Sequence, residues 1–211
     1  MPEIVLTKED IIKGEVIDTA QKLFQQYGFK KTTMEDIAQA MGRGKSTLYY
    51  YYKSKDMIFR DVILKEATEV MTALTEATGN EISSEKKLQT YVITFFDVVK
   101  SKVSLYNMMK KELMADEGIY INKPSLKKSL LQFNAEQFNL VKEILILGVE
   151  NKEFTSEIKD NIDVFAYILN VGLRSITFNL AFDAKSGMLG FFEDEKLKIM
   201  FNILMNGLRS V

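Results

Sequence analysis

Residues 32–53, TTMEDIAQAMGRGKSTLYYYYK, place two short helix-like stretches on either side of a turn. The apolar side chains of the first stretch recur at helical spacing and give it one apolar face: Met34, Ile37, Ala38 and Met41. Gly42 and Gly44 bracket the turn, after which residues 45–53 can form a further helix. A short helix, a glycine-bearing turn and another short helix predict a helix-turn-helix.

Four consecutive tyrosines, residues 49–52, cannot all face the same way in the second of these helices. Each helical residue turns by about 100°, so Tyr52 lies about 40° from Leu48 on the helix surface. Leu48 and Tyr52 are expected to face inward, and Tyr51 to project from a flank. The other positions form a polar arc suited to a nucleic-acid groove: Lys45, Ser46, Tyr49, Tyr50 and Lys53.

The residue types on this helix suit contacts with DNA. Lysine can bind guanine acceptors or phosphate, and hydroxyl groups can donate to phosphate oxygens. Threonine and tyrosine surfaces, Thr47 among them, can contact a thymine methyl group. A tyrosine run alone is nevertheless more typical of the core or surface of an ordinary helical bundle.

The segment before the helix-turn-helix reads as an amphipathic helix over residues 8–27. Its apolar positions recur at steps of three and four: Ile12, Val16, Ile17, Ala20, Leu23, Phe24 and Tyr27. Gly28 is expected to end this helix in the left-handed conformation, and Phe29 to pack back on the helix end.

Capping residues predict where the next helices begin. Thr32 and Thr33 are candidate N-caps of the second helix, and Glu35 lies three residues after Thr32, as a capping box requires. Ser54 can cap a fourth helix that runs until the loop at residues 78–84.

Apolar periodicity then continues through most of the chain, over residues 88–99, 105–114, 126–149, 164–182 and 197–208. Pro124 sits at a plausible helix start, and residues 187–192 separate the last two helices. The chain has only two prolines, and its glycines lie mostly between periodic stretches. These features predict an all-α fold.

Composition excludes several classes of function. The chain has no cysteine and no histidine, which removes thiolate nucleophiles, the commonest general base and the commonest metal ligands. We therefore expect no enzyme activity and no cofactor or metal. No apolar run approaches the roughly 20 residues that span a bilayer, and acids stand where a secretory signal would be basic. A cytoplasmic protein with no membrane partner is expected.

The charge is unevenly distributed along the chain. The formal net charge is −1, but residues 21–60 carry eight basic and three acidic side chains, a net +5 that leaves −6 elsewhere. A basic window on an otherwise acidic chain suits a polyanionic partner. A solvated charged face is the alternative.

The ordered motifs of residues 16–59 resemble the DNA-binding domain of the tetracycline-repressor (TetR) family of bacterial transcriptional regulators. They are TA-x-x-LF-x-x-x-GF, then TTM-x-x-IA-x-x-MG, then TLYYYYKSKD followed by an apolar pair. The resemblance implies a helix-turn-helix domain over residues 1–53 and a helical ligand-binding and dimerisation domain over residues 54–211. It also implies a homodimer on palindromic double-stranded operator DNA.

The resemblance further implies roles for single residues. Thr33 is expected to donate to phosphate, and Tyr52 to pack inside. The positions expected to approach bases are Lys45, Ser46 and Tyr49, and those expected to hold the DNA backbone are Tyr50, Tyr51 and Lys55. Arg43 replaces a usually apolar turn residue and either adds a phosphate contact or lays its stem over the domain. Gly44 replaces a frequent serine and offers no capping oxygen.

For the larger domain, the resemblance implies an apolar effector pocket. Residues that could line it are Phe95, Phe96, Met108, Met109, Phe133, Phe138, Leu145 and Phe165, with Tyr106 and Gln137 as orienting groups. The alternative for each of them is an ordinary core position. No cluster specifies which small molecule would bind.

Family analogy assigns dimerisation to the last two helices, at about residues 160–183 and 194–209. Asn170, Gly172 and Arg174 interrupt the apolar face of the first of these, and Gly172 could let two helices approach closely. A twofold dimer would hold two recognition helices about 34 to 36 Å apart. The leading hypothesis is a ligand-responsive DNA-binding repressor. The alternatives are a helical protein-interaction module that has lost operator binding and, less favoured, a small-molecule enzyme.

Overall fold

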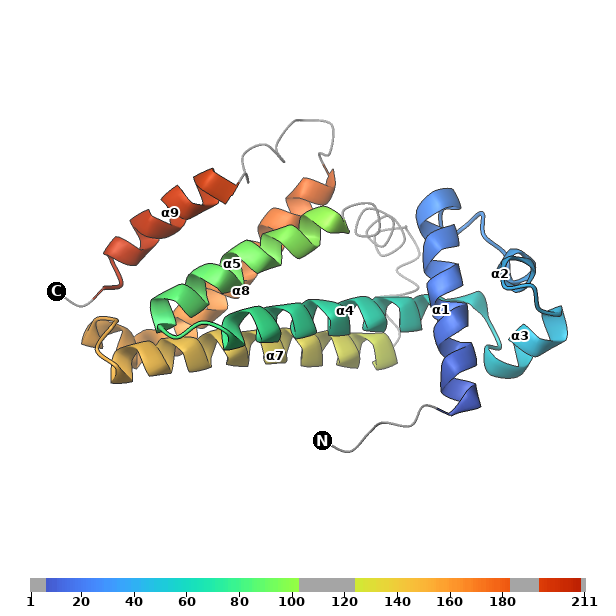
Figure 1. The fold of residues 1–211 in the computed structure, drawn as a ribbon, viewed down its shortest axis with the longest axis horizontal. Coiled ribbons are helices and arrows are strands. Elements are labelled where there is room, and N and C mark those ends of the chain that lie inside the picture. The colour runs from blue at the N-terminus through green and yellow to red at the C-terminus, as the bar shows by residue number, and fades with distance from the viewer. Residues whose placement is uncertain (1–6, 103–123, 183–193, 210–211) are drawn as a thin grey trace. The chain divides into compact units, whose positions relative to one another are not determined.

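The structure, a computed structural model, describes residues 7–102, 124–182 and 194–209. In these ranges the chain forms α-helices and a 3₁₀-helix (Figure 1), and its only strand-like pairing there is an isolated bridge between Phe154 and Arg209. The predicted all-α fold is confirmed. None of the helices in these ranges is long and apolar enough to cross a membrane.

The helices follow the predicted order. They are α1 (Lys8–Tyr27), α2 (Met34–Ala40), α3 (Lys45–Tyr51), α4 (Lys55–Gly79), α5 (Ser84–Ser101), α7 (Pro124–Glu150), the 3₁₀-helix η1 (Ser156–Asn161), α8 (Ile162–Phe182) and α9 (Asp194–Asn206). Pro124 is the first residue of α7, as expected. The sequence did not predict η1. The predicted segments 105–114 and 187–192 lie outside the described residues.

The chain divides into two compact units. Of the described residues, 7–66 and 124–126 form the N-terminal unit, and 67–102, 127–182 and 194–209 form the C-terminal unit. The division falls inside α4, after Glu66, and therefore beyond the border expected between residues 53 and 54. The first turns of α4 pack with the helix-turn-helix, because Phe59 lies in its aromatic core.

Three phenylalanines form that core. The ring of Phe29 lies 5.3 Å from that of Phe24 and 4.6 Å from that of Phe59, centroid to centroid, so Phe29 packs back on the end of α1 as predicted. Gly28 ends α1 with its N–H donating to the Phe24 carbonyl oxygen. Its φ of +86° is positive, as expected of glycine, but its ψ of 154° lies outside the left-handed helical region, which corrects that detail.

One of the two candidate N-caps of α2 is confirmed, but the capping box differs from the prediction. Thr33, and not Thr32, is the N-cap, and the capping box pairs it with Asp36 instead of Glu35. The hydroxyl of Thr32 is buried and donates to the Gly28 carbonyl oxygen at 2.9 Å, which places this side chain in the turn after α1. Glu35 is thereby left at the surface of α2.

The turn between α2 and α3 depends on Gly42. Its φ is +64°, and its N–H donates to the carbonyl oxygen of Gln39 while that of Arg43 donates to Ala38. This pair of bonds is the Schellman arrangement, in which glycine is favoured. Helix α3 then ends at Tyr51, two residues earlier than predicted, and Ser54 Oγ accepts from the Met57 N–H at 3.4 Å, as expected of the cap of α4.

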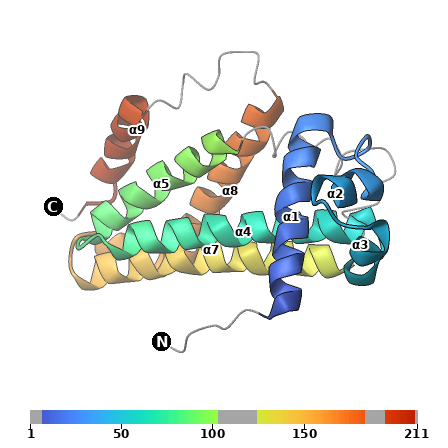
Figure 2. The same cartoon turned by 45° about the vertical axis from the view of Figure 1, so that its right-hand side comes forward.

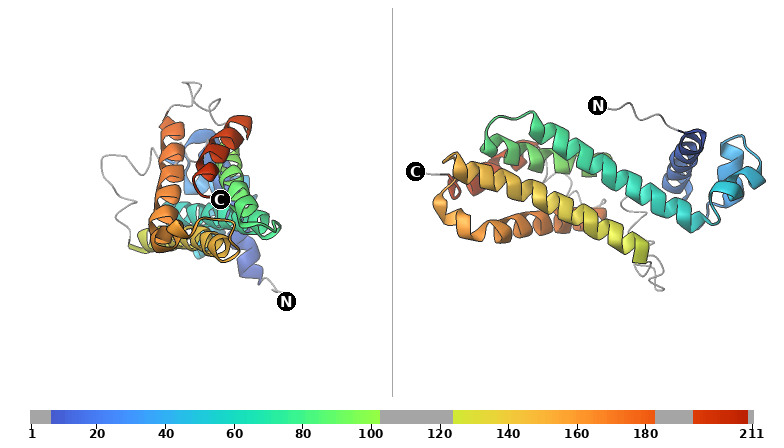
Figure 3. Two further views of the ribbon diagram at one scale, coloured as in Figure 1. Left: turned by 90° about the vertical axis from the view of Figure 1, so that its left-hand side faces the viewer. Right: turned by 90° about the horizontal axis from the view of Figure 1, so that it is seen from below.

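Helices α4, α5, α7, α8 and α9 contribute to one apolar core in the C-terminal unit. Helix α5 packs against both α8 and α9, and the C-terminal half of α4 runs alongside α7 (Figures 1 and 3). A Cβ on Gly148 of α7 would lie 2.1 Å from a ring carbon of the buried Phe154, so this close approach requires glycine. The core also encloses a polar pair: the Tyr91 hydroxyl donates to Asn170 Oδ1 at 2.6 Å.

Candidate nucleic-acid interface

Helix α3 has an inner and an outer side. Helices α1, α2 and α3 pack together in the N-terminal unit (Figure 2). Leu48 and Tyr52 are buried, as the helical wheel predicted. The Tyr52 hydroxyl donates to Asp61 Oδ2 on α4 at 3.0 Å, and burial together with this carboxylate raises the pKa of Tyr52. Tyr52 therefore stays protonated and fixes the end of α3 on α4.

The other three tyrosines are available to solvent to different degrees. Tyr50 is 73% exposed, whereas Tyr49 and Tyr51 are half-buried. The rings of Tyr50 and Tyr51 meet edge to face, with centroids 5.0 Å apart. This contact holds Tyr50 as a projecting phenol on the outer side of α3.

The predicted base-contacting residues gather at the start of α3. The Lys45 ammonium lies 5.7 Å from the Tyr49 ring centroid, and Ser46 is exposed. Lys45 also forms an ion pair with Glu35 of α2, a contact that the sequence analysis missed. The hydrogen bond from Lys45 lowers the pKa of Glu35, and the same bond raises the pKa of Lys45. Both groups are therefore charged at neutral pH.

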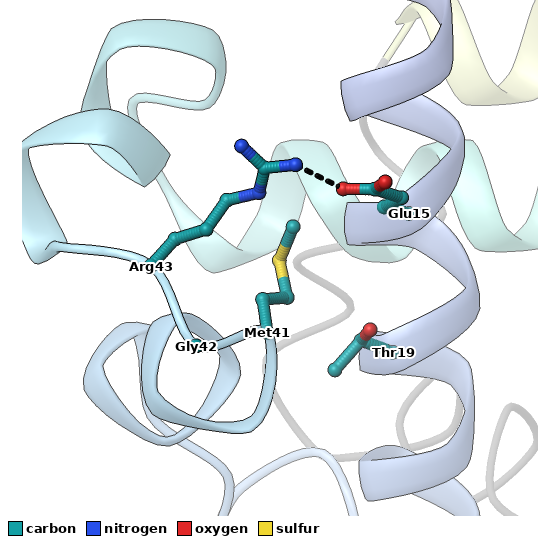
Figure 4. Close-up of a pocket in the computed structure, with 5 residues that line it drawn as sticks. All are labelled: Glu15, Thr19, Met41, Gly42 and Arg43. Carbon is teal, nitrogen blue, oxygen red and sulfur yellow. Dashed lines mark hydrogen bonds and ion pairs between the residues drawn. The ribbon is translucent and has the colours of Figure 1, made fainter.

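Arg43 bridges the turn to α1. Its guanidinium lies 2.6 Å from Glu15 Oε2, and the pair borders a pocket that Thr19, Met41 and Gly42 also line (Figure 4). Of the two roles expected for Arg43, its resting position matches packing over the domain more closely than reaching outward. A phosphate contact would require it to leave Glu15.

Thr33 and Lys55, both expected to bind phosphate, have internal partners. The Thr33 hydroxyl donates to Asp36 Oδ2 at 2.7 Å within the capping box. The Lys55 ammonium donates to the carbonyl oxygens of Phe29 at 2.6 Å and Thr32 at 2.7 Å, and lies 4.3 Å from the Phe29 ring centroid. Lys55 therefore ties the start of α4 to the turn between α1 and α2, whether or not it also contacts DNA.

We expect Lys55→Met to destabilise the N-terminal unit. The change leaves the two carbonyl groups without their donor, which should cost about 1 to 3 kcal/mol of the free energy of unfolding. Urea unfolding followed by tyrosine fluorescence measures it, with Lys53→Met as the control, since the Lys53 ammonium donates to the carbonyl oxygen of Tyr49, only four residues earlier. Equal stability of the two variants would contradict the structural role. If Lys55 also binds phosphate, the salt dependence of DNA binding should flatten.

The candidate effector-binding residues differ in how deeply they are buried. Phe95, Phe96 and Leu145 are fully buried in the C-terminal core, and Phe133 and Phe138 are half-buried against it. Phe165 is 41% exposed on an outward face of α8, so it does not join the buried residues of this group. Tyr106, Met108 and Met109 lie outside the described residues.

Gln137 is the distinctive residue of this group. It is 0% exposed, yet within the described part of the chain neither its Oε1 nor its Nε2 has a hydrogen-bond partner. Buried amides are nearly always hydrogen-bonded, because leaving one unsatisfied is costly. A cost of this kind is often accepted where a ligand supplies the missing partner.

Helices α8 and α9 expose apolar side chains. They are Val164, Phe165, Tyr167 and Ile168 on α8, and Ile199, Met200, Ile203 and Leu204 on α9. No heavy atom of the described chain, apart from its own neighbours, lies within 4 Å of a Cβ built on Gly172. The expectation that Asn170 interrupts the apolar face is wrong. Asn170 is buried on the core side of α8, where it accepts a hydrogen bond from the Tyr91 hydroxyl.

A helix-turn-helix whose recognition helix buries its inner face and exposes lysine, serine and tyrosine on its outer face is typical of DNA-binding transcriptional regulators. Residues 16–62 match the family model described as "Bacterial regulatory proteins, tetR family". This segment of the chain therefore belongs to a family of transcriptional regulators and not of enzymes.

Curated relatives agree with this family. The chain is 26% identical over 149 residues, 69% of each chain, to the HTH-type transcriptional repressor KstR2 of Rhodococcus jostii. It is 28% identical over 95 residues to the Staphylococcus epidermidis regulator IcaR, a negative regulator of the biofilm operon icaADBC. That second match spans 45% of this chain and about half of IcaR, 51%.

Solved structures share the whole fold. The fatty acid degradation regulator FadR from Bacillus halodurans aligns over 98% of this chain and 100% of its own, with a TM-score of 0.71 and 18% identity. FadR from Bacillus subtilis in complex with stearoyl-CoA aligns over 92% and 98%, with a TM-score of 0.68 and 16% identity.

Proposed function

We propose that this regulator is a repressor that binds operator DNA as a homodimer and is released by a small, largely apolar effector. The observation that carries DNA binding is the orientation of α3, with Leu48 and Tyr52 buried and Tyr50 projecting. The relatives KstR2 and IcaR, a repressor and a negative regulator, support the sign of regulation. A cytoplasmic location follows from this role.

The DNA-facing set is proposed to comprise Thr33, Arg43, Lys45, Ser46, Thr47, Tyr49, Tyr50, Tyr51 and Lys55. Lys45, Ser46 and Tyr49 would approach base edges. Thr33, Arg43 and Lys55 would have to exchange or share their internal partners to reach phosphate. For Arg43 the exchange is the most direct, because its partner Glu15 is a surface carboxylate.

An apolar effector is supported by the aromatic content of the C-terminal core and by Gln137 within it. Among proteins of the same fold, FadR from Bacillus subtilis is known in complex with stearoyl-CoA and SmeT with triclosan. Each of those ligands combines an apolar part with polar groups. We propose that the effector here offers Gln137 a group that both accepts and donates a hydrogen bond.

We expect Gln137→Met to stabilise the effector-free protein and to abolish its response to effector. The thioether has a similar volume and removes a buried, unsatisfied amide, which should add about 1 to 3 kcal/mol to the free energy of unfolding. Thermal unfolding checks this. Gln132→Met is the control on the same helix, because the Gln132 amide is exposed and bonded to Glu136. An unchanged stability at residue 137 would mean that water already satisfies the amide.

Helix α4 is the proposed link between effector and operator. It runs without interruption from Lys55, bonded to the turn of the DNA-binding region, to Gly79, and its residues Val70 and Leu74 lie in the C-terminal core. An effector that displaces this helix would change the position of α3 in each subunit. On functional grounds we retain residues 1–53 as the DNA-binding domain and 54–211 as the effector and dimerisation domain.

The apolar residues exposed on α8 and α9 are proposed to form the homodimer interface. Soluble proteins rarely leave contiguous apolar faces uncovered. A closed twofold dimer would cover both copies of this face and would present two α3 helices to two half-sites.

Selection of operators from random DNA, followed by binding measurements over a salt series, tests the proposed function. A regulator of this kind should enrich a palindrome and lose affinity steeply as salt rises. Failure to enrich any sequence, with salt-insensitive or absent DNA binding, would favour the alternative of a helical protein-interaction module. Mass spectrometry of co-purifying small molecules would identify the effector.

A further inference from the structure

Two cations of the helix-turn-helix are held by carboxylates from other helices of the same unit. Arg43 in the turn is paired with Glu15 of α1, and Lys45 at the start of α3 with Glu35 of α2. Figure 4 shows the first pair, in which the guanidinium points back to α1 across the pocket. Both cations belong to the set proposed to contact DNA.

We propose that Glu15 and Glu35 are specificity-determining residues that compete with DNA phosphates for Arg43 and Lys45 and thereby suppress binding to nonspecific DNA. This inference rests on the proposed function, since it concerns how the same interface chooses between operator and other sequences. Both contacts are between side chains, and each glutamate lies on a different element from its cation, so the cations can be released without unfolding a helix.

The two pairs are weak enough to open. All four side chains are more than a third exposed, and exposed ion pairs contribute little to stability. A surface of many phosphates can therefore draw the cations away when other contacts form at the same time. A contact with the DNA backbone alone replaces a carboxylate partner by a phosphate partner, and this replacement by itself contributes little binding free energy.

Operator and random DNA differ in the contacts that they can make when the ion pairs open. Nonspecific affinity comes almost entirely from neutralising phosphates, whereas an operator adds contacts to base edges. On random DNA, an arginine or lysine that remains paired with its glutamate neutralises no phosphate. On an operator, the added base contacts offset the opening of the pairs. The glutamates therefore weaken random binding more than operator binding.

The Glu35 carboxylate stays charged in the complex. A glutamate side chain ordinarily ionises well below neutral pH, so Glu35 needs no partner to remain ionised. When Lys45 leaves, an unpaired carboxylate stays on α2 beside the helix that enters the groove. Repulsion between like charges then disfavours every docking that lacks compensating contacts.

The test uses the full chain with Glu15→Gln, Glu35→Gln and the double change. Binding to a random-sequence duplex and to a selected operator of equal length is measured by fluorescence anisotropy over a salt series. We expect the double variant to bind random DNA about tenfold more tightly at low salt and to steepen the salt slope by about 0.9 for each freed cation. Operator affinity should rise less, so the ratio of the two affinities should fall.

Asp18→Asn is the matched control. Asp18 also lies on α1 and pairs across helices, but with Lys65 of α4, which is outside the proposed DNA-facing set. The control removes one negative charge from the same unit without freeing Arg43 or Lys45. Circular dichroism melting checks that all variants stay folded.

The outcomes separate this inference from the function on which it rests. Wild-type protein that binds no DNA would defeat the proposed function and this inference together. Wild-type protein that binds its operator, with glutamine variants whose ratio of operator to random affinity matches that of Asp18→Asn, would overturn this inference alone. A lower ratio in the glutamine variants than in the control would support it.

Discussion

Replacing Gly172 with leucine is expected to split the proposed homodimer and to reduce operator binding below detection. Phe165, Ile168 and Gly172 lie within about 60° of one another on the surface of α8, so Gly172 extends the exposed apolar stripe. A Cβ at this position meets no atom of the described chain outside α8, so the site has room for a larger side chain. We expect the leucine to clash instead with a second subunit that approaches closely over the glycine.

Loss of the proposed dimer should have a large effect, because its two subunits would bind two half-sites together. Joining two binding modules raises the overall affinity by about 10² to 10⁴-fold over a single module. Sedimentation velocity measures the oligomeric state of Gly172→Leu, and anisotropy measures operator binding. The melting of the N-terminal unit should be unchanged, since the substitution lies in the other unit.

Asn139→Leu is the control for added surface leucine. Asn139 is exposed on α7, about 160° around the helix from the buried Gln137, and it is remote from α8 and α9 in sequence. This variant should remain dimeric. A Gly172→Leu protein that is as tightly dimeric as wild type and still binds operator would remove Gly172 from the interface and leave it as a glycine that the helix merely tolerates.

Truncation of Tyr49 to alanine is expected to cost operator affinity and to spare random DNA. Its ring lies beside Lys45 on the outer side of α3, where we expect it to meet base edges. A good base contact contributes about 1 to 3 kcal/mol of discrimination, and a dimer makes two such contacts. Equal losses on operator and random duplexes would refute a base-contacting role.

Tyr50→Ala supplies the matched comparison, since the neighbouring phenol is expected to hold the DNA backbone. It should weaken binding to operator and to random DNA by similar factors. Tyr49→Phe separates the hydroxyl from the ring: retained selectivity would assign the contact to the ring face. If only Tyr50→Ala lowered the selectivity for operator DNA, Tyr50 would be the base-contacting residue and Tyr49 the one that holds the DNA backbone.

Local signals in the sequence were sufficient for the helices and for the inner face of α3. The bounds of α1, the packing of Phe29 and the burial of Leu48 and Tyr52 follow from spacing and from glycine. These features depend on residues three to four apart, whose relative positions any α-helix fixes. The same motifs also identified the family.

Cross-helix partners were not predictable in this way. Nothing in the spacing of Arg43 and Glu15, or of Lys45 and Glu35, distinguishes these pairs from other acid and base pairs on the same helices. The charge excess of residues 21–60 indicated a polyanion partner but not that two of its cations are held internally. Similarly, the match to a family position suggested phosphate for Lys55, whereas its carbonyl partners lie in a turn more than twenty residues away.

The sequence by itself determined that the chain is all-α, that it carries a helix-turn-helix and which side of α3 faces out. It did so because helical periodicity and caps are local. The tertiary structure decided that carboxylates of other helices hold Arg43 and Lys45, that Phe165 faces outward and that Gln137 is buried with no hydrogen-bond partner in the described chain. Each of these depends on which surfaces of separate helices meet, and helix crossing brings together residues whose distance in the sequence carries no information about contact.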